Sequence, residues 1–162
     1  MLIAAAAVYG GGSYTALKRE QLNELNALCH TLRLMQDELE TRALPLPELA
    51  AQLDTRTENA GKALLSGLLR RLPELGSRDF QNIWEECVTE SVKHSEEAAR
   101  LLCTLGSFLG RYDVDSQSEA IRSCRETLEK LRTTAAEALP QTRRLGMGLA
   151  LTSGALIVIT LI

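Results

Sequence analysis

The chain has 162 residues, of which 18 are Lys or Arg and 21 are Asp or Glu, so its formal net charge is −3. This length suits a single domain, and the lack of a basic excess argues against a nucleic-acid-binding protein. Every Asp, Glu, Lys and Arg lies between Lys18 and Arg144, which predicts a charged middle domain between two uncharged ends.

The first segment, residues 1–17, is uncharged and would span about 25 Å as a helix, slightly short for a membrane helix. A cleaved signal peptide would carry positive charge before its apolar core, whereas here Lys18 and Arg19 follow it. Positive residues favour the cytoplasmic side of a membrane. We therefore expect residues 1–17 to be an N-terminal transmembrane segment, and the alternatives are a single C-terminal anchor or signal cleavage.

Residues 18–142 predict a cytoplasmic bundle made of helices alone. Helical spacing puts Leu22, Leu25, Leu28, Leu32, Met35 and Leu39 on one face of a helix that ends near Arg42. Glu24 is expected on its polar face. Pro45 and Pro47 mark a turn before a short helix over residues 47–53.

Three more helices are expected over residues 58–72, 79–93 and from Ser95 onwards. Ser77 and Ser95 are the predicted N-caps of the last two. Gly106 and Gly110 are four residues apart, a spacing that indicates tight helix packing more often than a dimer face. Asp113 or Asp115 should then start a long helix towards Pro140.

The last segment, residues 143–162, begins with Arg143 and Arg144, and no charged side chain follows. Its uncharged run would span roughly 27 Å as a helix, close to the thickness of the hydrocarbon core of a bilayer. We expect a C-terminal transmembrane helix here, with a buried C-terminal helix as the alternative. The arginines favour the same cytoplasmic middle domain as Lys18 and Arg19.

No segment of the sequence contains a complete motif for catalysis or metal binding. Residues 59–64 lack the first glycine and the hydroxyl of a phosphate-binding loop, and residues 113–124 lack the glycine and glutamate of a calcium loop. The four cysteines show no CxxC pair and predict reduced core thiols. We expect no enzyme activity, cofactor or metal, and keep a site assembled from His94 and Cys103 as an alternative.

Two charged clusters are candidate contacts for a protein partner. One is basic, and the other is acidic and belongs to the predicted helix 79–93. They consist of Arg70, Arg71 and Arg78, and of Glu85, Glu86 and Glu90. A run of charges is more often a solvated helix face, because exposed ion pairs contribute little by themselves.

The order of short motifs along the chain resembles the family of stage III sporulation protein AB of endospore-forming bacteria. The resemblance covers nearly the whole chain. The matching motifs are Gln21-Leu22, the turn from Pro45 to Ala50, Trp84-Glu85, the run from Leu105 to Gly110 with Asp113 after it, the helix beginning near Gln117, and Arg144-Leu145-Gly146.

This resemblance implies a membrane protein of the mother cell, within the channel complex that joins mother cell and forespore across the engulfing membranes. It also implies a cytoplasmic domain similar to that of the type II secretion platform protein. The implied partners are other stage III sporulation channel proteins, notably the cytoplasmic ATPase called stage III sporulation protein AA. The resemblance leaves homo-oligomerisation open. A soluble or singly anchored helical regulatory protein is the alternative.

Overall fold

The computed structural model describes the backbone of residues 2–109 and 113–160 and the side chains of residues 15–109 and 113–138. All regular structure in these ranges is helical, which confirms the all-α prediction. The elements are α1 (Leu2–Arg42), α2 (Leu46–Asp54), α3 (Asn59–Arg71), the 3₁₀ turn η1 (Leu72–Glu74), α4 (Phe80–Ser91), α5 (Glu96–Gly106) and α6 (Val114–Thr160).

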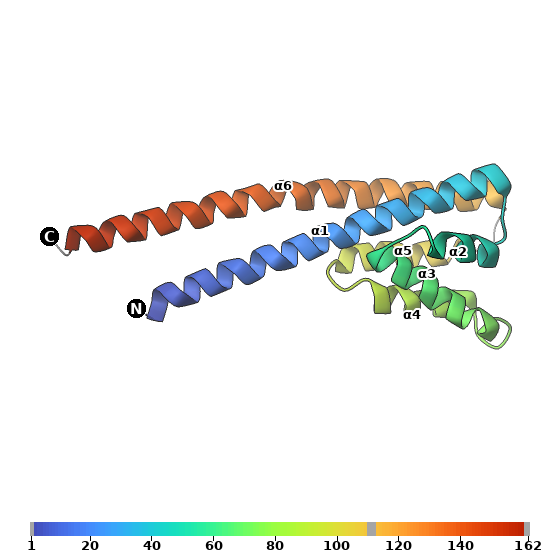
Figure 1. Ribbon diagram of the computed structural model, residues 1–162. Helices are drawn as coiled ribbons and strands as arrows, with labels where there is room; N and C mark the ends of the chain where they lie inside the picture. Colours follow the sequence, from blue (N-terminus) through green and yellow to red (C-terminus); the bar gives the residue numbers. More distant parts are fainter. Residues whose placement is uncertain (1, 110–112, 161–162) are drawn as a thin grey trace.

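Two long helices form a hairpin that carries the four short ones. Figure 1 shows α1 and α6 side by side, with α2 to α5 gathered along one side of the hairpin near its closed end. The outer ends of α1 and α6 lie at the same end of the molecule and splay apart there. At the closed end the Ser118 hydroxyl donates a hydrogen bond to Glu40 at 2.6 Å, so the two helices are joined where the short ones begin and end.

Helix α1 is continuous from its glycine-containing start, and its apolar stripe faces the core as predicted. The stripe is fully buried except for Leu22, which is half-buried; its buried members are Leu25, Leu28, Leu32, Met35 and Leu39. The helix ends at Arg42, and Ala43 adopts a φ of 49° while its N–H still bonds to the Leu39 carbonyl. This left-handed geometry is usual for the residue after a helix, although glycine normally occupies it because a Cβ adds strain.

The predicted turn at Pro45 and Pro47 is confirmed. Pro45 is the residue before α2, and Pro47 lies in the first helical turn, where a missing N–H costs nothing. The next helix, α3, packs against α1 at very close range: a Cβ on Gly61 would overlap the Thr31 hydroxyl. Thr31 avoids an unpaired hydroxyl by donating to the Ala27 carbonyl at 2.8 Å.

The two predicted serine caps have different outcomes. The Ser95 hydroxyl accepts the N–H of Ala98 at 3.3 Å and caps α5, which confirms that prediction. The prediction for Ser77 was wrong: its hydroxyl donates to the Glu74 carbonyl, and Asp79 is the residue before α4. The η1 turn accounts for the difference, because it leaves Ser77 in a tight bend rather than next to a helix.

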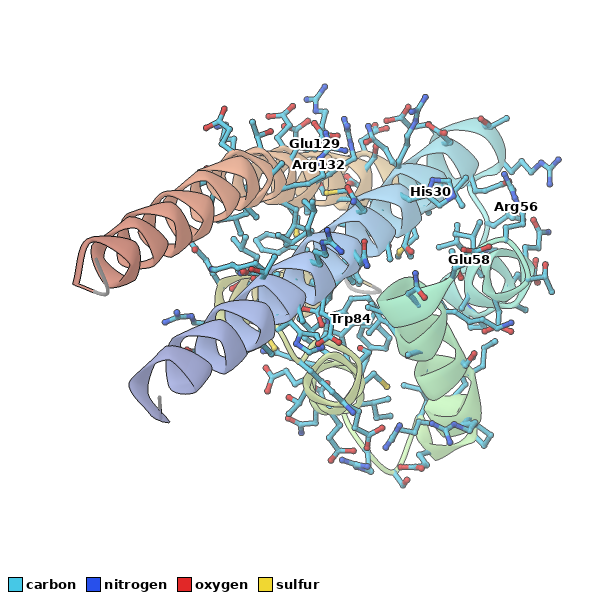
Figure 2. All side chains as sticks on the ribbon, turned by 60° about the vertical axis from the view of Figure 1, so that its left-hand side comes forward. His30, Arg56, Glu58, Trp84, Glu129 and Arg132 are labelled. Carbon is cyan, nitrogen blue, oxygen red and sulfur yellow. The ribbon has the colours of Figure 1, made fainter. Side chains whose placement is uncertain are left out.

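Trp84 is the largest fully buried side chain among the described residues. Figure 2 shows it inside the bundle, between α1 and the short helices. Its indole N–H donates to the Leu102 carbonyl at 2.7 Å, and Gly106 lies directly against the ring, so that a Cβ there would overlap Cδ1. Gly106 is therefore a packing glycine, as expected. Gly110 lies outside the described residues.

Helix α6 begins as predicted beside Asp113, whose carboxylate accepts the N–H of Ser116 at 2.8 Å. It then continues as one helix of 47 residues, about 70 Å long, so the regions on either side of Pro140 share one helix. Ile121, Cys124 and Leu128 contribute to the core facing α1.

The two predicted membrane segments stay predictions. Residues 1–17 and 143–162 belong to α1 and α6, but their side chains lie outside the described residues apart from residues 15–17. Within residues 15–109 and 113–138, no helix is both long and apolar enough to cross a membrane.

Candidate functional site

The two predicted charged clusters come together as one network around α4. Arg71, from the last turn of α3, bonds Glu90 at 2.5 Å and lies 3.6 Å from Glu86. Arg78, in the bend before α4, pairs with Glu86 and bonds Glu74 at 2.9 Å. Two arginines of the basic cluster are therefore the partners of Glu86 and Glu90 in the acidic cluster.

Each charged form in this network is favoured by its neighbours. Hydrogen bonds to Glu86 and then Glu74 raise the pKa of Arg78. The hydrogen bond from Arg78 lowers the pKa of Glu86, and the hydrogen bond to Glu90 raises the pKa of Arg71. All these side chains are at least partly exposed, so the network orients them more than it stabilises the fold.

Two of the six predicted contact residues lie outside the network. Arg70 is exposed, and within the described residues it makes no ion pair. Glu85 accepts a hydrogen bond from Gln81 at 3.1 Å and is half-buried. Sequence spacing alone did not show which of the six residues form ion pairs, because the pairs join three separate elements.

The network leaves α4 with a negative surface, which we call the α4 face. It is a shallow depression of about 490 Å³ lined by Arg78, Asn82, Glu85, Glu86, Thr89 and Glu90. Three carboxylates of this lining stand against two guanidinium groups, Arg78 in the lining and Arg71 beside it, so the carboxylates remain in excess. A surface of this kind favours a positively charged partner and disfavours a negatively charged one.

Glu24 was wrongly assigned to the polar surface of α1. It is only 6% exposed, and its carboxylate accepts the backbone N–H of Lys93 at 2.8 Å and that of His94 at 3.1 Å. These N–H groups lie in the junction between α4 and α5. Glu24 therefore fixes this junction to the long hairpin, and with it the position of the α4 face.

The free cysteines differ in exposure. Cys29, Cys87 and Cys124 are buried, whereas Cys103 is half-buried. Burial raises the pKa of all four thiols, and that of Cys124 reaches about 12. Because only the thiolate reacts, these environments suppress reactivity.

We therefore expect Cys103 to be the first thiol modified by iodoacetamide in the folded protein. At pH 8 its rate should exceed that of Cys29, Cys87 and Cys124 by roughly tenfold or more, because the buried thiols react only after local opening. Mass spectrometry of timed samples would give the rates, with the Cys103→Ser variant and the denatured chain as references. Equal rates at all four sites in the folded chain would contradict this assignment.

The alternative enzyme site is not assembled by the fold. His94 precedes α5 and lies 3.7 Å from Glu20, while Cys103 is two turns further along α5. Burial, and then the charge of Glu85, raise the pKa of Cys103, whereas an activated nucleophile has a lowered pKa. Among the side chains that the structure describes, no group of three His, Cys, Asp or Glu could hold a metal ion.

The fold defines the class: an all-α protein in which a long helical hairpin carries a cluster of short helices with one acidic face. Comparison with known proteins gives the particular family. A model of the stage III sporulation protein AB family matches residues 1–162, and the chain belongs to this family.

A solved structure described as stage III sporulation protein AB (SpoIIIAB) has the same fold, with a TM-score of 0.65. The match covers 75% of this chain and 97% of that one, at 21% sequence identity. A comparison with curated proteins found no match. The family predicted from the order of motifs is thus confirmed.

Proposed function

We propose that the protein is a non-enzymatic scaffold subunit of the sporulation channel complex between mother cell and forespore. Its helical domain would couple the secretion-type ATPase, stage III sporulation protein AA, to membrane subunits on the mother-cell side. Membership of the stage III sporulation protein AB family supports this role. Fold and family alone do not specify a contact, so the contact is argued from the surface.

The arrangement of the long helices supports a membrane-anchored scaffold. The outer ends of α1 and α6 lie at one end of the molecule, and the short helices lie near the other. If residues 1–17 and 143–162 both span the membrane, the short helices project from the same side of it. This geometry agrees with the positive residues that favour a cytoplasmic middle domain.

The observation that carries the proposed contact is the network around α4. Arg71 and Arg78 hold the carboxylates of Glu86 and Glu90 in fixed positions, and Glu24 holds the adjoining junction. Preorganised charges lose less conformational entropy on binding than free side chains do. The α4 face is therefore a suitable docking surface for a basic patch on the ATPase.

Adding positive charge to the α4 face tests this contact without removing an ion pair. Asn82 and Thr89 are exposed in the depression, and neither belongs to the network. The double variant Asn82→Lys with Thr89→Lys should weaken binding of stage III sporulation protein AA by roughly tenfold or more at low salt. The difference should shrink as salt screens the charges. Binding would be measured by biolayer interferometry on the full chain in detergent.

A matched control is Asn26→Lys with Thr133→Lys. It makes the same change of net charge at exposed positions on α1 and α6. Equal weakening by both double variants would mean that only overall charge matters. If the α4 double variant binds stage III sporulation protein AA as tightly as the unchanged protein does, the α4 face is not the contact.

A further inference from the structure

The turn between α3 and α4 carries an exposed leucine. Leu75 is 40% exposed, and within residues 15–109 and 113–138 only two other large hydrophobic residues are exposed to at least that degree. Of these, Leu17 belongs to the predicted N-terminal membrane segment, and Phe108 lines a groove between α5 and α6. Leu75 lies in neither region. Its turn is at the edge of the short helices that faces away from α1 and α6 (Figure 1).

Hydrogen bonds to the backbone hold this turn in one shape. The Leu75 N–H donates to the Leu72 carbonyl at 3.1 Å. The N–H groups of Ser77 and Arg78 both donate to the Glu74 carbonyl, each at 3.1 Å, and the Ser77 hydroxyl donates to it at 2.8 Å. The backbone around Leu75 is therefore preorganised, and a partner that covers the leucine need not order the turn first.

Leu75 is connected to the α4 face through its neighbours in the turn. The backbone of Leu75 pairs with that of Arg78 in an isolated β-bridge. The Arg78 guanidinium lines the α4 face and bonds both Glu74 and Glu86. The leucine therefore lies beside charged side chains that are already held in position. Protein–protein contacts commonly have this composition, in which a few apolar anchors inside a polar rim carry most of the binding energy.

We propose that Leu75 is the apolar anchor of the contact that the α4 face makes. The partner then presents a shallow apolar pocket for the leucine, with lysine or arginine residues beside it that face the excess carboxylates of the α4 face. This inference rests on the proposed function and names the chemistry of the surface that the ATPase presents. Charge selects the partner, and the leucine adds affinity that salt does not screen.

The variant Leu75→Asn tests the anchor, because asparagine is polar and no larger than leucine. Covering the exposed part of a leucine contributes about a factor of ten in affinity, so the variant should bind stage III sporulation protein AA roughly tenfold more weakly. The loss should be the same at low and high salt, whereas the loss with Asn82→Lys and Thr89→Lys shrinks. Leu75→Met keeps an apolar side chain of similar volume and should retain binding within about twofold.

Phe108→Ala is the matched control for the loss of an exposed hydrophobic side chain. Phe108 is exposed to the same extent as Leu75, but it lines a groove between α5 and α6 and no part of the α4 face. Its replacement should leave binding of the ATPase unchanged. Binding would be measured by biolayer interferometry on the full chain in detergent, at a temperature at which circular dichroism shows every variant folded.

The anchor and the α4 contact can fail separately. If Asn82→Lys with Thr89→Lys weakens binding and Leu75→Asn does not, the α4 face remains the contact and Leu75 is not its anchor. If the double lysine variant binds normally, the α4 contact itself is wrong, and the anchor assigned to it is wrong as well. Equal loss with Leu75→Asn and Phe108→Ala, or a loss with Leu75→Asn that shrinks as salt rises, would also overturn the assignment.

Discussion

Replacing Gly106 by alanine should lower the stability of the folded domain by about 3 kcal/mol, at the upper end of the usual range for overpacking. A Cβ at this position would overlap Cδ1 of Trp84 and lie 2.9 Å from its Cγ. The indole cannot move away cheaply, because it is fully buried and its N–H is bonded to the Leu102 carbonyl. Thermal unfolding followed by circular dichroism should show a midpoint about 6–12 °C lower.

Gly67→Ala is the matched control for this variant. Gly67 is also a buried helical glycine, but a Cβ there would meet Cys87 Sγ at 3.6 Å, an ordinary contact. Alanine favours helix by roughly 1 kcal/mol over glycine, so Gly67→Ala should be neutral or slightly stabilising. If Gly106→Ala unfolds at the same temperature as Gly67→Ala, the close packing of Trp84 on Gly106 is not a constraint on the fold.

Replacing Glu24 by alanine should cost about 2–3 kcal/mol, because hydrogen bonds to a charged group contribute about that much. The variant leaves the N–H groups of Lys93 and His94 without their carboxylate acceptor. The loss should be local as well as global, since these bonds fix the junction between α4 and α5. Hydrogen exchange in the variant, compared with the unchanged protein, should therefore become faster at residues 92–95 by more than it does at the core of α1.

The control is Glu20→Ala, one turn earlier on α1. Glu20 is exposed and lies 3.7 Å from the His94 ring, so its removal should change stability by less than about 0.5 kcal/mol. Equal effects of the two alanine variants would show that Glu24 acts only as one more surface charge. Unchanged exchange at residues 92–95 in Glu24→Ala would show that its carboxylate does not hold the junction.

The helices were predictable because local signals and burial agree along most of the chain. Each of three correct predictions depends only on residues close together in the sequence. They are the apolar stripe from Leu25 to Leu39, the prolines at the start of α2 and the Ser95 cap. The Ser77 prediction was wrong because the 3₁₀ turn before it leaves Ser77 in a bend, where its hydroxyl bonds back to Glu74, and Asp79 takes the position before α4. Short-range patterns cannot distinguish these cases.

The contacts between distant segments were not predictable from the same patterns. Glu24 is a charged residue between two positions of the apolar stripe and was therefore assigned to the surface, yet its carboxylate accepts two backbone N–H groups nearly seventy residues later. Gly61 was not assigned to the core, although it meets Thr31 of α1. The charged clusters were found, but their pairing through Arg71 and Arg78 depends on how α3 packs beside α4.

The hairpin also determines how tension would pass through the molecule. Both outer ends lie together, and the closed end is joined by the bond between Ser118 and Glu40. A force that pulls the two ends of the chain apart would therefore separate α1 from α6 one turn at a time, starting at their outer ends. The load would reach the short helices once the opening passed Glu24, whose carboxylate bonds to the junction between α4 and α5. Tension applied at the ends of the chain would thus act on the junction that positions the α4 face.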